Sequence, residues 1–299
     1  MRRILLVTGL WPTADQPSAG IFVRRRVDSP RFTVVAPTSY AGPMPLRYLR
    51  LGLAALTKRG RYGGVEAHPL FPAGLIGLLA ARIRRIPLVT YAHGADVRVT
   101  SVENPVYNLL ARLVVRSSAA VVANSSDTAS LVQRLGGSAV IIPPGVDLSH
   151  FRPSPRPTER RVLYLGGTDP RKGFAVAREH ADTLVGPGLE TVEPDGVADL
   201  LRAHDIVLVP SLEEPYGLVA AEAIASGRWV VARATGGLRD IVEDGLSGTL
   251  VEADEDFGPA IASVPDYDPF AVAARAARFS LVQSNRAMAA LWDDILGSA

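Results

Sequence analysis

Short apolar runs alternate with segments of helical periodicity along most of this chain. The runs ILLVTG at residues 4–9 and DIVLV at residues 205–209 are almost wholly apolar, which is typical of parallel strands covered by helices on both faces. Such alternation predicts an α/β fold with doubly wound parallel sheets. It stops at residues 143–157, a proline-rich stretch expected to be a semi-rigid linker, and begins again near Arg161. The sequence therefore predicts two domains.

Composition narrows the function classes. The 299 residues suit two domains of ordinary size, and a hydrophobic content of 47% is enough for two cores. A net charge of +2 gives no bulk electrostatic case for a nucleic-acid partner. The lack of cysteine excludes disulfides, thiolate catalysis and cysteine-ligated metals. No apolar run has the length of a membrane span, and residues 1–10 lack a signal-peptide cleavage site, so we expect a cytoplasmic protein.

Two glutamates eight residues apart, Glu214 and Glu222, flank the start of a predicted short helix. The helix opens at Gly217 and closes before Gly227, so Glu214 lies in the loop and Glu222 in the second turn. The open amides and positive dipole end at Gly217, Leu218 and Val219 suit a phosphate. Glu222 lies roughly 5 Å further along, where a carboxylate can accept hydrogen bonds from sugar hydroxyls. Alternatively, these acidic residues only stabilise the helix, with Glu222 facing solvent.

The segment from Pro210 to Glu252 decides between these alternatives, because PSLEEPYGLVAAEAIASG and the following GGLRDIVEDGLSGTLVE resemble the signature of retaining GT-B glycosyltransferases of family four. The resemblance implies two Rossmann-like domains facing a central cleft. It implies Glu214 near the donor sugar, with a catalytic role, and Glu222 on the nucleotide ribose. It also implies no cofactor and no metal beyond the nucleotide-diphosphate sugar. We expect residues 1–152 with 269–299 to form the acceptor-side domain, with its C-terminal helix crossing back, and residues 158–268 to bind the donor.

Other segments are similar to parts of the same family. HGAD at residues 93–96 resembles the HG-x-D element, in which the histidine reaches the donor sugar and the reacting centre. The resemblance implies His93 as catalytic and Asp96 as donor-binding, whereas a lone histidine at a strand end is more often structural. Gly20 corresponds to the glycine loop that lines the cleft in this family.

The segment GGTDPRKG at residues 166–173 departs from the family pattern. The family places an arginine and a lysine there to neutralise the diphosphate; Lys172 is present, but Gly167 stands in the place of the arginine. The chain from Phe174 to Asp205 is also shorter than usual, by roughly one strand and one helix. We expect a substitute cation among Arg24 to Arg26, with Arg171 as the alternative; the arginine run is otherwise a solvated helix face with one member turned inward.

Two further segments leave alternatives. Leu46, Leu49, Leu53 and Leu56 stand at helical spacing with basic residues around them. We interpret this helix as packed on the sheet, the alternative being a weak peripheral contact with an anionic membrane that holds a lipid-linked acceptor. The run Asp254 to Asp256 superficially matches the Asp-x-Asp metal signature, but we interpret it as an acidic helix start.

The sequence thus predicts a retaining glycosyltransferase that moves a sugar from a nucleotide-diphosphate sugar to an acceptor hydroxyl of a glycan, a lipid-linked compound or a small natural product. The alternatives are a sugar-nucleotide epimerase or phosphorylase of the same fold, or a catalytically weak nucleotide-sugar-binding subunit. No motif identifies the base, the sugar or the acceptor.

Overall fold

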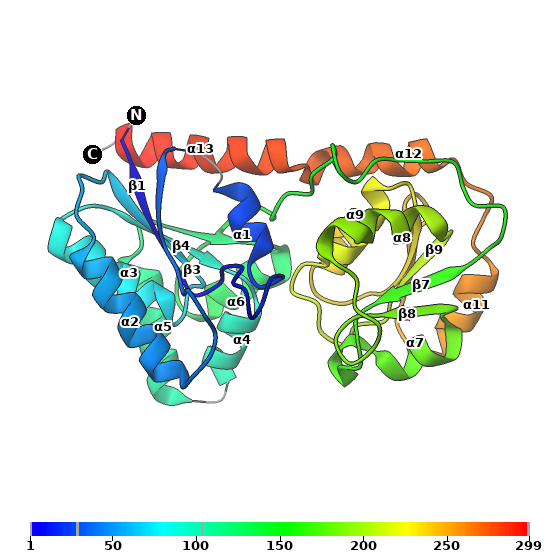
Figure 1. The fold of residues 1–299 in the computed structure, drawn as a ribbon, viewed down its shortest axis with the longest axis horizontal. Coiled ribbons are helices and arrows are strands. Elements are labelled where there is room, and N and C mark those ends of the chain that lie inside the picture. The colour runs from blue at the N-terminus through cyan, green and yellow to red at the C-terminus, as the bar shows by residue number, and fades with distance from the viewer. Residues whose placement is uncertain (1, 28–29, 103, 298–299) are drawn as a thin grey trace. The chain divides into compact units, whose positions relative to one another are not determined.

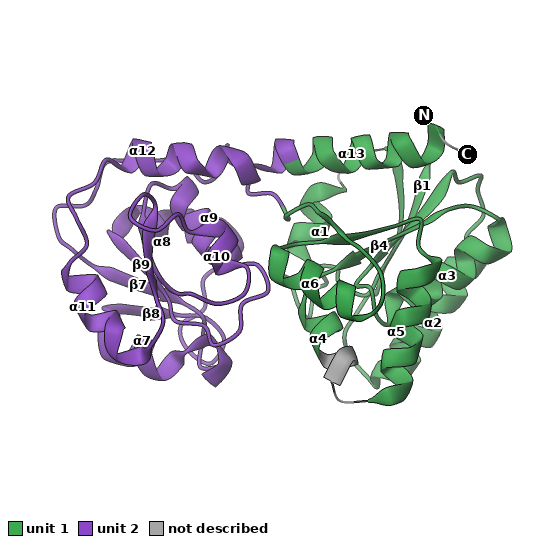
Figure 2. Cartoon of the chain, turned by 180° about the vertical axis from the view of Figure 1, so that it is seen from behind, with its two compact units in different colours: residues 1–144, 284–299 green, residues 145–283 purple. Residues whose placement is uncertain are grey.

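The computed structural model describes residues 2–27, 30–102 and 104–297, and the chain forms two compact units (Figure 2). Unit 1 comprises residues 1–144 and 284–299, and unit 2 comprises residues 145–283. Each unit has its own parallel sheet with helices around it (Figure 1). The predicted restart of the strand–helix alternation is therefore confirmed.

The sheet of unit 1 has six strands in the order β2-β1-β3-β4-β5-β6. Its central strands are buried throughout, as their unbroken apolar runs predict. The strands are β1 (Ile4–Thr8), β2 (Phe32–Val35), β3 (Gly64–His68), β4 (Leu88–Ala92), β5 (Ala120–Ala123) and β6 (Val140–Ile141).

Helices cover both faces of this sheet. One face packs against α2, α3 and α5, which bury Leu51, Leu78 and Val114 in one core cluster. The other face is covered by α1 and by the C-terminal helix α13, whose Met288 and Trp292 join a separate cluster. The helices of unit 1 are α1 (Ile21–Arg26), α2 (Met44–Thr57), α3 (Ala73–Arg84), α4 (Ala95–Val102), α5 (Pro105–Ser117) and α6 (Ser126–Arg134), together with most of α13 (Leu281–Gly297).

Unit 2 repeats the architecture with five strands in the order β11-β10-β9-β7-β8. The strands are β7 (Val162–Leu165), β8 (Thr183–Val185), β9 (Ile206–Val209), β10 (Trp229–Arg233) and β11 (Gly248–Val251). The α-helices are α7 (Phe174–His180), α8 (Val197–Ala203), α9 (Leu218–Ala225), α10 (Leu238–Ile241), α11 (Phe257–Ala262) and α12 (Pro269–Ala274). Short 3₁₀ turns are η1 (Pro170–Lys172), η2 (Pro194–Gly196), η3 (Asp254–Asp256) and η4 (Arg275–Phe279).

The two units divide at different residues from those expected at 152, 158 and 269. Val146 and Phe151, within the proline-rich stretch, are buried in the core of unit 2, so this stretch belongs to that unit from Gly145 onward. At the other end, α12 packs against α9, and the chain returns to unit 1 only from Ser284 onward. The helical stretch beginning at Pro269 is therefore shared between the units.

The Asp254 to Asp256 segment forms η3, directly before α11. Asp254 is paired with Arg233, and Asp256 accepts a hydrogen bond from the amide of Ala253 at 3.3 Å. This is the acidic helix start that the sequence predicted.

Candidate functional site

In unit 2, the loop that ends β9 leads through Glu214 into α9, and the helix begins and ends as predicted. Gly217 has a φ of 103° and precedes the first turn, where no side chain caps the amides of the helix. Glu214 lies in the loop, and Glu222 lies in the second turn, with 8% of its surface exposed. The prediction that Glu222 might face solvent is thus not met.

Three glycines allow backbones to approach around this loop. A Cβ on Gly217 would lie 2.7 Å from Cδ2 of Leu238, and one on Gly236 would lie 2.2 Å from the carbonyl oxygen of Glu214. The amide of Gly237 donates to that same oxygen at 2.8 Å. The segment Gly236 to Leu238 therefore supports the Glu214 loop from behind, and each glycine is needed for contact rather than for flexibility.

Lys172 and Glu214 form a charged pair beside the start of α9. Lys172 Nζ lies 2.7 Å from Glu214 Oε2, and the hydroxyl of Ser211 donates to the same oxygen at 3.2 Å. The lysine reaches this position because Gly173 packs on the carbonyl of Pro210, where a Cβ would lie 2.2 Å from the oxygen. The structure thus brings together the lysine and the first glutamate of the predicted donor site.

Gly167, in the place of the family arginine, is held by its backbone. Its φ is 67°, and a Cβ there would lie 2.4 Å from the carbonyl oxygen of Pro187. Its amide donates to Val185 at 3.1 Å, so the loops after β7 and β8 interlock. An arginine at this position would require both loops to move. Arg171, the nearby alternative, is paired with Asp169 at 2.8 Å on the surface.

In unit 1, His93 follows β4 and is the outer member of a buried polar chain. Its Nε2 lies 2.9 Å from Nδ1 of His68, and His68 Nε2 lies 2.8 Å from Oε1 of Glu66. The ring of Tyr91 stacks on both histidines, with centroids 4.7 Å and 4.8 Å away. The position of His93 is therefore fixed by the stacked ring of Tyr91 and by the hydrogen bond between its Nε2 and His68.

At the inner end of this series of hydrogen-bonded side chains, Glu66 is bound by charged and aromatic groups from distant elements. Arg26 from α1 pairs with Glu66, and the indole of Trp292 in α13 donates to Glu66 Oε2 at 2.7 Å. Arg26 is thus the member of the arginine run that turns inward, which corrects the expectation that it was available as a diphosphate cation. Glu66, His68 and Trp292 were missed by sequence reasoning; an acid and a histidine within the apolar strand β3 were the available signal.

Asp96 and Gly20 lie near this cluster. The two carboxylate oxygens of Asp96 accept from the amides of His93 at 3.0 Å and Leu70 at 2.8 Å. Burial raises the pKa of Asp96 to about 6, against the effect of these hydrogen bonds. Gly20 has a φ of 64° at the start of α1, where a Cβ would lie 2.4 Å from the backbone of Leu10. Phe22, two residues on, meets His93 edge to face at 5.0 Å.

Both histidines of this cluster, His68 and His93, are held neutral. Burial lowers the pKa of His68 and of His93 well below the usual value, and the Arg26 charge lowers both further. A group whose folded pKa is depressed in this way binds its proton only after unfolding. Protonation of the unfolded state therefore destabilises the fold as the pH falls through about 6.5.

We expect the free energy of unfolding to fall between pH 7.5 and 6.0, with a slope of at most about 1.4 kcal/mol per pH unit for each histidine. Urea titrations followed by circular dichroism measure it. His93→Asn should reduce this slope, and His180→Gln, a control outside the cluster, should not. The comparison stays at or above pH 6.0 because Asp96, with its pKa raised to about 6, is half protonated at that pH and contributes in the opposite sense increasingly below it. Equal slopes for wild type and His93→Asn would contradict the assignment.

Among the described residues, no group of three or more acidic or histidine side chains is placed to hold a metal ion. Within the same part of the chain, no helix is both long and apolar enough to cross a membrane.

Each of the two units matches a known protein family. A family model described as Glycosyltransferase Family 4 matches residues 6–150, and one described as Glycosyl transferases group 1 matches residues 155–264. The D-inositol 3-phosphate glycosyltransferase of Geodermatophilus obscurus is 33% identical over 69% of this chain and 60% of its own length. Its Mycobacterium bovis counterpart is 32% identical over 67% of this chain and 53% of its own length. The chain thus spans little more than half the length of these curated relatives.

Solved structures agree on the fold. Anabaena HepE in complex with UDP-glucose superposes with a TM-score of 0.77 at 21% identity, covering 98% of this chain and 100% of that one. Sucrose-phosphate synthase from Thermosynechococcus elongatus gives a TM-score of 0.78 at 18% identity, with 100% of both chains covered. The two parallel sheets are those of the GT-B fold, and the chain belongs to the family-four, group 1 glycosyltransferases.

Proposed function

We propose that this protein is a retaining glycosyltransferase that moves a sugar from a nucleotide-diphosphate sugar to an acceptor hydroxyl. The observation that carries the proposal is in unit 2: the Lys172–Glu214 pair lies in the same loop system as the uncapped start of α9, one turn from the buried Glu222. A cation, open amides and a buried carboxylate are the groups that a diphosphate and a ribose require. The UDP-glucose bound by Anabaena HepE supports this donor class.

Each group then has a role in the reaction. The amides of Gly217 to Val219 and the ammonium of Lys172 hold the diphosphate, where negative charge increases as the leaving group departs. Glu222 accepts hydrogen bonds from the ribose hydroxyls, and Glu214 orients the sugar. The leaving phosphate takes the acceptor's proton on the same face, so the chain supplies electrostatic preorganisation rather than a dedicated base.

His93 is assigned to the donor sugar as a neutral imidazole. Its Nε2 is bound to His68, so Nδ1 is the ring nitrogen that remains for the sugar. Asp96 acts through the backbone of His93 rather than on the donor, because its oxygens accept from amides. Gly20 keeps α1, and with it Phe22, close to His93.

The acceptor and the location of the enzyme are part of the proposal. The curated relatives are named for D-inositol 3-phosphate, which supports a polyol or sugar phosphate as acceptor. A cytoplasmic location follows from the sequence expectation and is carried here as a prediction. An epimerase or phosphorylase would be recognised by turnover without an acceptor alcohol, or by a requirement for inorganic phosphate.

Glu222→Ala should weaken UDP and UDP-glucose alike, by ~1 to 3 kcal/mol, because a charged hydrogen bond to the ribose is lost. Calorimetric titration measures both affinities. Glu213→Ala removes an acidic side chain from the neighbouring loop and serves as the matched control. Unchanged affinity for UDP in Glu222→Ala, or equal losses in both variants, would contradict the ribose assignment.

We expect full transferase activity in EDTA, since Asp254 pairs with Arg233 and Asp256 caps a helix turn. Activity lost in EDTA and restored by Mn²⁺ would instead assign a metal to the reaction.

His93→Ala should lower turnover at least ~10-fold while leaving UDP affinity within twofold, as expected for a residue that acts on the sugar rather than the nucleotide.

Unit 1 also carries an exposed apolar face. Leu46, Leu49 and Leu53 of α2 are 41%, 59% and 57% exposed. The helix packs on the sheet as expected, but not through these three leucines. The buried side chains of α2 are instead Leu51 and Ala55.

The neighbouring helices continue this face. Contacts place α3 between α2 and α5. Large apolar side chains are exposed on α3 and on α5, namely Leu79 and Ile83 on α3 and Val106, Leu109 and Leu113 on α5. Basic residues follow at the helix ends: Lys58, Arg59, Arg61, Arg82, Arg85 and Arg116. Glu66 is the only acidic residue between positions 44 and 92, and it is buried. An apolar face with basic ends matches an anionic bilayer surface, so we extend the proposal to a peripheral membrane contact there.

Co-sedimentation with vesicles tests this contact. We expect binding to phosphatidylcholine vesicles that contain phosphatidylglycerol, weaker binding to phosphatidylcholine alone, and loss of binding as the salt concentration rises. Leu49→Glu/Leu53→Glu should reduce binding at least ~10-fold. Leu246→Glu, at a side chain 51% exposed in unit 2, is the control. Binding that is indifferent to the double substitution would remove this face from consideration.

A further inference from the structure

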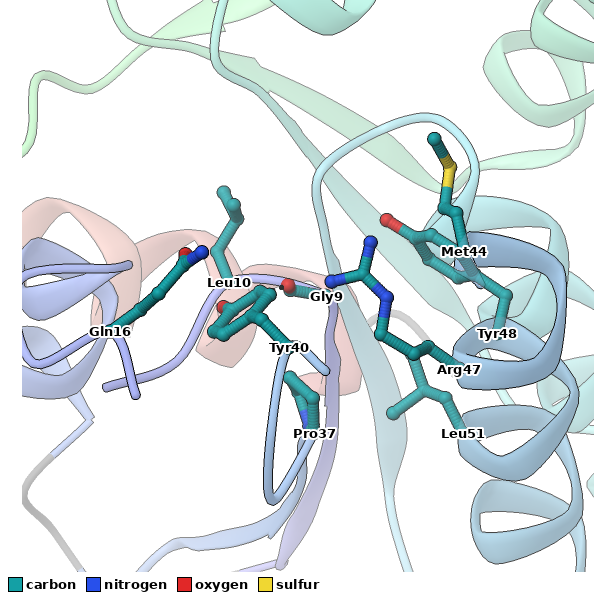
Figure 3. Close-up of a pocket in the computed structure, with 9 residues that line it drawn as sticks. All are labelled: Gly9, Leu10, Gln16, Pro37, Tyr40, Met44, Arg47, Tyr48 and Leu51. Atoms are coloured by element: carbon teal, nitrogen blue, oxygen red, sulfur yellow. Dashed lines mark hydrogen bonds between the residues drawn. The ribbon is translucent and has the colours of Figure 1, made fainter. Parts of the chain in front are cut away.

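A cavity of about 320 Å³ lies in unit 1 beside the carboxyl ends of β1 and β2 (Figure 3). Its walls come from the segments that follow these strands and from the first two turns of α2, which contributes Met44, Arg47, Tyr48 and Leu51. Parallel sheets bind ligands outside the carboxyl ends of their strands. A volume of this size suits a small ligand.

The pocket is built rather than incidental, because side chains fix both of its loops. The hydroxyl of Tyr40 lies 3.1 Å from the carbonyl oxygens of Gly9 and Trp11 and accepts from the amide of Trp11 at 2.9 Å. Asp15 accepts from the amide of Tyr40 at 2.7 Å. On the opposite wall, Tyr48 packs so closely on Gly9 that a Cβ there would lie 2.7 Å from its hydroxyl. The two loops therefore hold one another in place.

Arg47 is the charged group of the pocket. Its side chain extends from α2 between Tyr40 and Tyr48, and its guanidinium carbon lies 5.4 Å from the ring centroid of Tyr40 (Figure 3). In the part of the chain that the structure describes, Arg47 forms no ion pair, and its buried Nε has no hydrogen-bond partner. A buried donor without an acceptor is costly. The unsatisfied Nε of Arg47 therefore points to a ligand that supplies an acceptor.

The surroundings define the chemistry of that ligand. A planar guanidinium matches the two oxygens of a phosphate or carboxylate. Met44, Leu51 and the two tyrosine rings offer apolar contact beside it, and Tyr48 places a hydroxyl at the wall. The pocket therefore fits a compound with one anionic group next to a ring or apolar portion.

We propose that this pocket binds the acceptor, as a phosphate- or carboxylate-bearing compound whose anionic group is held by Arg47 and whose ring or apolar portion packs on Tyr40, Met44 and Leu51. The acceptor role rests on the proposed transferase function, whereas the binding of an anion at Arg47 does not. The anionic group can belong to a soluble compound or to the headgroup of a lipid. Both sources share the same contact with Arg47.

Phenyl phosphate is the soluble probe. The fluorescence of Trp11, whose backbone amide donates a hydrogen bond to the Tyr40 hydroxyl, reports binding beside the pocket. We expect saturable binding to wild type and much weaker binding of phenol. Arg47→Leu should raise the dissociation constant at least ~10-fold, and Arg47→Lys should raise it less because it keeps the charge without the planar fork. Arg50→Leu, one turn further along α2 and exposed, is the matched control and should behave as wild type.

Vesicles distinguish the two sources of the anion. If the acceptor is a lipid, Arg47→Leu should reduce binding to phosphatidic acid vesicles more than to phosphatidylglycerol vesicles, because only the former present a phosphomonoester. If the acceptor is soluble, Arg47→Leu should leave both vesicle affinities unchanged while still losing phenyl phosphate.

Two results would overturn the inference: no saturable binding of phenyl phosphate to wild type, or equal losses in Arg47→Leu and Arg50→Leu. Circular dichroism and UDP titration of each variant establish that it is folded. If Arg47→Leu does not fold, Arg47→Lys and Tyr48→Phe are read in its place, and unchanged affinity in both counts against the pocket. If the wild type binds phenyl phosphate but not UDP, the transferase proposal is rejected, whereas the proposed anion site is retained.

Discussion

The buried carboxylate of Glu66 is the group on which unit 1 depends. It lies in the middle of β3 with its side chain 0% exposed, and a lone charge at such a position would be prohibitive. Arg26 from α1 supplies the opposite charge, and hydrogen bonds come from His68 on its own strand and from the indole of Trp292 in α13. Removing one partner of a buried pair usually costs about 3–5 kcal/mol. The end of the chain is therefore tied to its beginning by an electrostatic requirement as well as by apolar packing.

The same requirement shapes the site in unit 1. Burial disfavours a proton on His68 and on His93, and the Arg26 guanidinium next to them disfavours it further. His93 is thus a neutral imidazole with a fixed orientation rather than a cation. Asp96 completes the arrangement from the other side by holding the amide of His93. Burial, reinforced by an arginine within the sheet, thus keeps a group at the carboxyl end of β4 neutral.

Sequence reasoning succeeded where the determining interactions are local. The strand–helix alternation, the start of α9 at Gly217 and the acidic turn at Asp254 each follow from neighbouring residues, and the structure has them as predicted. It failed where partners are distant: Glu66 and Trp292 are separated by 226 positions, and no periodicity connects them. For α2, a helical repeat of leucines was visible, but which side of the helix faces the sheet depends on Leu51 and Ala55 and on the neighbouring α3.

The loop at Gly167 shows why a missing family residue is not simply a gap in the site. The positive φ and the contact with Pro187 make glycine the residue that the interlocked loops after β7 and β8 require. An arginine there and this loop packing exclude one another, so the departure is a change of backbone as well as of charge. Lys172 remains the charged residue of this loop region that pairs with Glu214, with its Nζ 2.7 Å from Glu214 Oε2. Because both side chains are partly exposed, this pairing costs little to exchange.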